Sequence, residues 1–173
     1  MDRETHSYLK SLIPERPTVL REMELYAIEN NFPIVGPLVG RFLFQAATMI
    51  KARKILELGS GFGYSAFWFS LATKGKGQII MTDGDKNNKP RAFDYFKRAG
   101  LLSQFLFKVG DAINLAKRID GPMDIILNDI DKVDYHNTID LAAAKLRKGG
   151  LFITDNIIWS GRVLEKKQDK TTR

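Results

Sequence analysis

The chain has 173 residues, of which 44% are hydrophobic, so it is long enough for one well-packed domain and too short for two of ordinary size. It contains no cysteine, which excludes disulfides, thiolate nucleophiles and thiolate metal ligands. The N-terminus is polar and no apolar run is long enough to span a bilayer, so we expect a cytoplasmic protein without membrane contact. The 27 basic and 20 acidic residues give a net charge of +7, which attracts anionic partners.

Residues 1–52 are predicted to form N-terminal helices that pack outside a central sheet. Apolar residues recur at helical spacing over 5–31, and Pro14 and Pro17 divide this stretch into two helices. The segment 32–40 contains two prolines and two glycines and is predicted to be a loop. A helical pattern resumes over 41–52.

Strand-like and helix-like segments alternate through the rest of the chain. Strands are predicted at 54–58, 78–82, 105–109, 123–128 and 150–154, and helices at 64–72, 87–99, 112–119 and 135–146. Because the strands are almost continuously apolar, the alternation predicts an α/β fold: a Rossmann-like, doubly wound, mostly parallel sheet with helices on both faces. Ligands of such sheets bind at the carboxyl ends of the strands.

A glycine-rich turn follows the first predicted strand, within the segment Ile55–Ser65. Gly59, Gly61 and Gly63 favour a nucleotide-type cofactor, because glycine permits tight turns and close approach of a ligand to the backbone. The dinucleotide fingerprint requires a further glycine at position 64, where this chain has Tyr64. Glu57 would repel a pyrophosphate but suits an ammonium and a sulfonium. The turn therefore favours S-adenosylmethionine as the cofactor, with Gly59, Gly61 and the nearby Ser65 as candidate contacts.

Acidic residues follow the second and third predicted strands. Asp83 is placed to accept hydrogen bonds from ribose hydroxyls, with a helix N-cap as the alternative. Asp111 and Ala112 lie where an adenine edge could be met, although Asp111 is equally well interpreted as an N-cap.

Polar residues also follow the fourth and fifth predicted strands. Asp129, Asp155 and Asn156 would bring three oxygen ligands to one rim, which suits a hard divalent cation such as Mg²⁺. Lys132 lies three residues after Asp129, and an amine beside a cation can have its pKa lowered enough to act as a base. Taken singly, these residues could be loop carboxylates, N-caps and a surface charge. The two histidines, His6 and His136, have no partner at ligand spacing and are predicted to be surface or cap residues.

The sequence resembles the cation-dependent class I O-methyltransferases of the caffeoyl-CoA and catechol type, especially their small bacterial and archaeal members. The resemblance spans nearly the whole chain and rests on Glu57-Leu-Gly-Ser-Gly-Phe-Gly-Tyr-Ser65, Asp129-Ile-Asp-Lys132 and Gly149-Gly-Leu-Phe-Ile-Thr-Asp-Asn-Ile-Ile-Trp-Ser-Gly161. It implies that Val35, Glu57, Gly59, Ser60, Ser65, Asp83 and Ala112 contact S-adenosylmethionine, that Asp129, Asp155 and Asn156 hold the cation, and that Lys132 is the base.

The resemblance implies a metal-dependent methyl transfer from S-adenosylmethionine to a hydroxyl of a small catechol-like or hydroxylated aromatic molecule. Two alternatives stay open: methylation of a hydroxyuridine in tRNA, suggested by the net charge, and an S-adenosylmethionine-binding module with impaired catalysis. We expect one methyltransferase domain over 1–173, with a cofactor-binding core at 53–161 and a polar tail at 162–173. Family members continue into a further helix and an antiparallel strand pair, which we expect to be missing here and which would support a homodimer.

Overall fold

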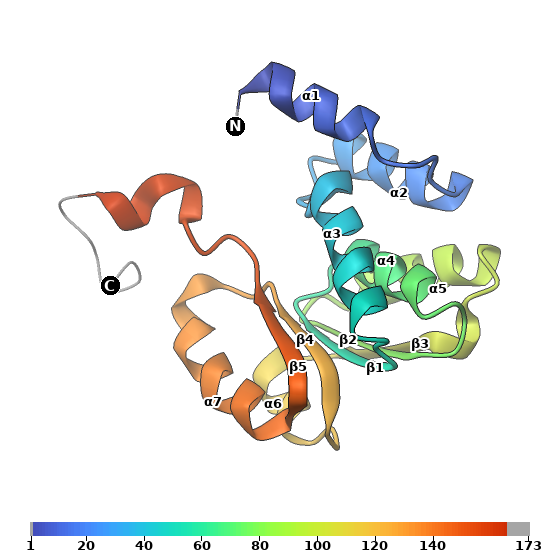
Figure 1. Cartoon of the computed structure of the whole chain (residues 1–173). Helices are drawn as coiled ribbons and strands as arrows, with labels where there is room; N and C mark the ends of the chain where they lie inside the picture. The colour runs from blue at the N-terminus through green and yellow to red at the C-terminus, as the bar shows by residue number, and fades with distance from the viewer. Residues whose placement is uncertain (1, 166–173) are drawn as a thin grey trace.

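The computed structural model describes residues 2–165, and its centre is a five-stranded parallel sheet with the spatial order β3-β2-β1-β4-β5 (Figure 1). The chain moves outward from β1 to β3, then crosses back to β4 and β5, so the strand order reverses between β1 and β4. The predicted α/β, doubly wound fold is confirmed. The strands are β1 (Lys54–Leu58), β2 (Gln78–Asp83), β3 (Phe105–Val109), β4 (Met123–Asn128) and β5 (Leu146–Thr154).

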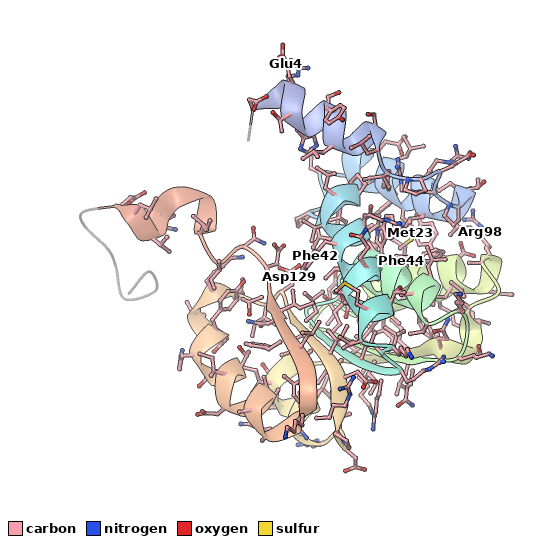
Figure 2. The ribbon with its side chains drawn as sticks, in the orientation of Figure 1. Glu4, Met23, Phe42, Phe44, Arg98 and Asp129 are labelled. Carbon is pink, nitrogen blue, oxygen red and sulfur yellow. The ribbon has the colours of Figure 1, made fainter. Side chains whose placement is uncertain are left out.

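Helices cover both faces of this sheet. The helices α2 to α5 lie on one face and α6 and α7 on the other (Figure 1). Met23 of α2 is fully buried in the first of these layers, and Asp129 marks the carboxyl end of β4 (Figure 2). The α-helices are α1 (Arg3–Ser11), α2 (Thr18–Glu29), α3 (Gly36–Met49), α4 (Tyr64–Ala72), α5 (Asn88–Arg98), α6 (Ala112–Lys117) and α7 (Tyr135–Lys145), and short 3₁₀ turns are η1 (Leu102–Gln104), η2 (Lys132–Asp134) and η3 (Trp159–Leu164).

The sheet has a separate apolar core on each face, because successive side chains of a strand point to opposite sides. Ile55 of β1 packs with α2 to α5, and its neighbour Leu56 packs with α6 and α7; both are fully buried. This double burial explains why the strands are almost continuously apolar. Glu57 is the exception in β1, since it is fully buried although it carries a carboxyl group.

The N-terminal helices follow the prediction up to residue 31, with the break at Pro14 and Pro17 between α1 and α2. The predicted loop over 32–40 is wrong in its second half, because α3 begins at Gly36. Proline is favoured in the first turn of a helix, and Pro37 occupies that turn. Gly40 is a packing residue inside α3: a Cβ there would lie 2.1 Å from Trp68 Nε1.

Strand β5 begins at Leu146, four residues before the predicted start. The pair Gly149–Gly150 resembles a turn in the sequence but lies inside the strand, where the pairing with β4 shifts register between Met123 and Ile125. Such glycines mark an irregularity in a strand rather than its beginning. Of the predicted polar tail, residues 162–164 belong to η3, and residues 166–173 lie outside the described part of the chain. None of the helices between residues 2 and 165 is long and apolar enough to cross a membrane.

Candidate functional site

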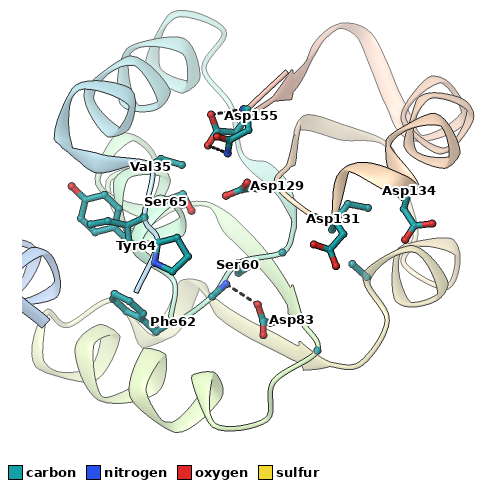
Figure 3. A pocket seen from close by; sticks show the side chains of 18 of the residues that line it. Val35, Ser60, Phe62, Tyr64, Ser65, Asp83, Asp129, Asp131, Asp134 and Asp155 are labelled. Carbon is teal, nitrogen blue, oxygen red and sulfur yellow. Dashed lines mark hydrogen bonds between the residues drawn. The ribbon is translucent and has the colours of Figure 1, made fainter. Parts of the chain in front are cut away.

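A cavity of about 700 Å³ opens at the carboxyl ends of the strands, where the strand order reverses (Figure 3). Residues that follow all five strands reach its wall, together with the loop before α3. Every residue predicted for the site lines this cavity except Glu57. The lining comprises Phe32, Pro33, Ile34, Val35, Gly59, Ser60, Gly61, Phe62, Tyr64, Ser65, Asp83, Gly84, Gly110, Asp111, Ala112, Ile113, Asp129, Ile130, Asp131, Lys132, Asp134, Asp155 and Asn156.

The glycine turn between β1 and α4 is held by backbone contacts that exclude side chains. The amides of Gly59 and Ser60 both donate to the carbonyl of Thr82, at 3.1 and 2.9 Å. Gly59 has a φ of 80°, and a Cβ there would lie 2.4 Å from the carbonyl oxygen of Asp129. Glycine is therefore required at position 59, because a side chain there would keep the end of β4 away from the turn. The close approach of β4 brings Asp129 to the cavity.

Glu57 lies behind the cavity wall rather than in it. Its side chain is fully buried, its Oε1 accepts a hydrogen bond from the Ser65 hydroxyl, and its Oε2 has no partner among the described residues. Burial raises the pKa of Glu57 to about 8; the Ser65 and Ser60 hydroxyls oppose this rise, and the charges of Asp129 and Asp83 add to it. A buried oxygen without a partner fits a cationic ligand, because a positive group would compensate its desolvation.

Asp83 ties the end of β2 to the glycine turn. Its Oδ2 accepts from the Gly61 amide at 2.8 Å (Figure 3), and its Oδ1 accepts from the Asp85 amide at 2.8 Å and from Asn88 Nδ2 at 3.0 Å. The alternative role as the N-cap of α5 is not observed, since Asn87 is the residue at that position. Its carboxylate borders the cavity, where a diol could donate to it.

Asp111 is the N-cap of α6, which is one of the two roles left open above, and its contact with an adenine edge stays a prediction. Its Oδ1 accepts from the Asn114 amide at 2.7 Å, so it caps α6, and it also lines the cavity beside Ala112. The side chain is exposed and the cap uses one of its oxygens.

Asp129, Asp155 and Asn156 meet at the rim formed by β4 and β5. Asp155 accepts from the Asn156 amide at 2.8 Å and from Asn156 Nδ2 at 2.9 Å. Asp129 lies beside this pair (Figure 3), and its pKa is raised to about 6 by burial first and then by the charge of Asp155, while Lys132 and the Asn156 amide lower it. Two close carboxylates are the donor set that a divalent cation stabilises.

The fit to a cation rests on two carboxylates and one amide. Between residues 2 and 165 no group of three or more His, Cys, Asp or Glu side chains is arranged to hold a metal ion. Because Nδ2 of Asn156 donates to Asp155, its Oδ1 remains the amide atom that can ligate a metal. The three residues therefore fit a hard cation that takes its other ligands from water or substrate.

Lys132 and Tyr135 stand beside this rim. The Lys132 ammonium lines the cavity and lies 5.9 Å from the centre of the Tyr135 ring. The Tyr135 hydroxyl donates to the backbone carbonyl of Asp155 at 2.8 Å, so it links α7 to the end of β5. His6 and His136, predicted to be surface or cap residues, are both exposed.

The charge of the cavity is strongly negative although the chain as a whole is positive. Among the residues that the structure describes, six aspartates line it and Lys132 is the one basic residue in its lining. An arrangement of this kind repels a pyrophosphate and attracts a cationic ligand.

The sequence prediction missed several residues of the wall. Phe32, Pro33 and Ile34 belong to a segment predicted to be a loop outside the sheet, whereas Asp131 lies inside the motif Asp129-Ile-Asp-Lys132 and Asp134 lies two positions after it. The signal that could have located the last two is their place after β4, since the whole loop at that strand end faces the cavity. No pattern in the sequence places residues 32–34 there.

Comparisons with known proteins agree with this geometry. Residues 6–173 match a family described as O-methyltransferase. The catechol O-methyltransferase of Niastella koreensis is 35% identical over 136 residues, which cover 76% of this chain and 62% of that enzyme. The caffeoyl-CoA O-methyltransferase of Stellaria longipes is 28% identical over 168 residues, which cover 91% of this chain and 70% of that enzyme. The match thus spans less than two thirds of the Niastella enzyme.

A solved methyltransferase structure from Geobacter sulfurreducens resembles the fold. It superposes with a TM-score of 0.82 at 26% sequence identity, covering 96% of this chain and 89% of that chain. The likeness therefore extends over nearly all the elements described above.

Proposed function

The chain belongs to the O-methyltransferase family, and from this premise we propose that it transfers a methyl group from S-adenosylmethionine to a hydroxyl of a small catechol-like or hydroxylated aromatic molecule, with the help of a divalent cation. One observation carries the proposal: a single acidic cavity brings together the glycine turn, a carboxylate suited to ribose and a pair of carboxylates suited to a cation. The relatives named above as catechol and caffeoyl-CoA O-methyltransferases support this substrate class.

The proposed cofactor residues fit S-adenosylmethionine better than a dinucleotide. Asp83 would accept from the ribose hydroxyls, and Asp111 and Ala112 would border the base. Glu57 would attract the amino group through its free oxygen, and Val35 and Ser65 would close the same side of the cavity. The acidic lining favours this cationic ligand for the reason given above.

The proposed catalytic residues lie at and beside the rim formed by β4 and β5. When bound, S-adenosylmethionine supplies the methyl group and the cation lowers the pKa of the hydroxyl that receives it. Asp129, Asp155 and Asn156 would hold the cation, most readily Mg²⁺, and so place the substrate oxygens. Lys132 Nζ would accept the hydroxyl proton, and the remaining contribution of the chain would be to position the reactants.

Isotopic methyl transfer tests this proposal. The chain is incubated with labelled S-adenosylmethionine, Mg²⁺ and a catechol, with and without excess chelator, and in parallel with tRNA that carries hydroxyuridine. We expect the label to appear in the catechol when no chelator is present, and we expect excess chelator to abolish this transfer. Transfer that persists undiminished in chelator contradicts the metal role of Asp129, Asp155 and Asn156.

The same experiment separates the alternatives. Label in tRNA rather than catechol would favour the RNA substrate, whose binding through basic residues would also weaken with salt. Binding of S-adenosylmethionine without transfer to either acceptor would favour a binding module. Lys132→Ala is the informative variant, because it is expected to lower the rate while leaving cofactor affinity unchanged. A homodimer is also proposed, and sedimentation tests it.

A further inference from the structure

Phe32 stands between two cavities. Its half-buried side chain lines the site described above and also a second cavity of about 520 Å³, which lies between α1, α2 and the start of α3. Pro33 and Ile34 are shared in the same way, so residues 32–34 form the partition between the two spaces. Phe32 is the aromatic member of this partition.

The ring of Phe32 is held from several sides. Its backbone amide donates to the carbonyl of Ala27 at 2.9 Å, which fixes the segment to the end of α2. Its ring meets Phe62 edge to face, with centroids 4.8 Å apart and planes at 69°. Phe62 is itself buried and meets Tyr26 at 5.2 Å in a second edge-to-face contact. Such pairs fix ring orientation as well as burying area.

The absence of a side chain at Gly61 makes room for this ring. Gly61 has a φ of 50°, and a Cβ built on it would lie 2.9 Å from Phe32 Cε1 and 3.1 Å from Cζ. The Phe32 ring therefore fills the space above the glycine turn that a side chain at 61 would take. The two positions are matched, although they are 29 positions apart and nothing in the sequence links them.

The nearness of Gly61 also locates the ring relative to the proposed ligand. Its amide donates to Asp83, the carboxylate proposed to hold the ribose, and the sulfonium of S-adenosylmethionine is attached to that ribose by one carbon. The ring of Phe32 is thus beside the part of the cavity where the positive sulfur would lie. The electron-rich face of an aromatic ring attracts a cation, and more strongly where water is excluded.

We propose that Phe32 recognises the sulfonium charge of S-adenosylmethionine and makes the site favour this cofactor over its neutral product, S-adenosylhomocysteine. The inference rests on the proposed function and names a positioning residue supplied by the segment between α2 and α3. It also gives the ring a part in turnover, because the attraction ends when the methyl group and the charge have left.

Calorimetric titration of both ligands tests the inference without relying on activity. Phe32→Leu keeps an apolar side chain and removes the aromatic face; Phe42→Leu is the matched control, because Phe42 lies exposed on α3 and does not line either cavity (Figure 2). We expect Phe32→Leu to weaken S-adenosylmethionine binding about fivefold and to change S-adenosylhomocysteine binding less than twofold. Phe42→Leu is expected to change neither.

Equal weakening of both ligands by Phe32→Leu would overturn the inference and leave a packing role, and unchanged binding of both would overturn it as well. If the unaltered chain binds neither ligand, the proposed function fails first and this inference fails with it. Gly61→Ala gives an independent check, because its Cβ must displace the ring. In the otherwise unaltered chain, Gly61→Ala is expected to reduce the preference for S-adenosylmethionine over S-adenosylhomocysteine. In a chain that already carries Phe32→Leu, it is expected to reduce this preference no further. An equal reduction in both chains would contradict the pairing of Phe32 with Gly61.

Discussion

Glu57→Gln is expected to stabilise the free protein and to weaken cofactor binding. With a pKa of about 8, Glu57 is mostly protonated in the folded chain at pH 7, whereas an ordinary value of 4.5 leaves it ionised in the unfolded chain. Folding at pH 7 must therefore protonate it, which costs about 3 kcal/mol. Glutamine is neutral in both states and can accept the Ser65 hydrogen bond, so it removes most of this cost.

The pH dependence of the free energy of unfolding shows in which direction Glu57 changes stability. A folded pKa above the unfolded one means that the folded chain binds more protons, so stability falls as the pH rises from about 4.5 to about 8. The wild-type chain is expected to lose stability over this window through Glu57, and Glu57→Gln is expected to lack that component. Urea denaturation at pH 5, 6, 7 and 8 measures both profiles, and parallel profiles for the two chains would refute the reasoning.

The second part of this prediction concerns the effect of Glu57 on cofactor binding. A cationic amino group beside the free Oε2 would ionise Glu57, so binding at pH 7 is expected to release up to about 0.9 proton. Calorimetry in buffers of different ionisation enthalpy measures the released proton. Glu57→Gln is expected to abolish the release and to weaken binding at least about tenfold, the value of one charge-assisted hydrogen bond.

Three further substitutions test the site and the packing that supports it. Asp83→Ala is expected to weaken S-adenosylmethionine binding by at least about tenfold in calorimetry, because it removes the carboxylate that holds the Gly61 amide. Asp124→Asn is expected to cost about 2 kcal/mol in urea denaturation, since Asp124 accepts from the amides of Arg53 and Lys54 and from Arg147 Nε. Burial alone would raise the pKa of Asp124, but these hydrogen bonds outweigh burial and lower it. The stabilisation is therefore present above about pH 4 and is lost as the pH falls further. A variant with the same free energy of unfolding as wild type at both pH 3 and pH 7 would contradict this. Gly40→Ala is expected to cost at least about 2 kcal/mol, because its Cβ would collide with Trp68, whereas Gly84→Ala, with open space around it, serves as the control.

Most of the fold could be predicted because its strands are buried on both faces and its turns carry glycine or aspartate. The runs at 54–58 and 123–128 are predicted to the residue, since the first ends at the glycine turn and the second ends at the polar residues Asn128 and Asp129. The starts of α3 and β5 could not be predicted. Gly40 and Gly150 are required by neighbours distant in sequence, Trp68 and the backbone of Asp124, and therefore resemble turn residues when the sequence is read alone.

The site was predictable where its residues sit at strand ends, and less so elsewhere. Asp83, Asp129 and Asp155 each follow a strand, and parallel strands bring their carboxyl ends to one edge. The burial of Glu57 depends on α4 packing over β1, which no local pattern shows. Phe32 enters the wall only because Gly61 leaves space for it, and that is a property of the folded chain.

The account depends most directly on whether the acidic cavity binds S-adenosylmethionine. Equilibrium dialysis of the labelled cofactor against the chain, with S-adenosylhomocysteine as competitor, measures this without any acceptor or metal. The account predicts saturable binding at one site per chain that the competitor displaces and that Asp83→Ala weakens. Absence of saturable binding, or binding that Asp83→Ala leaves unchanged, would contradict it.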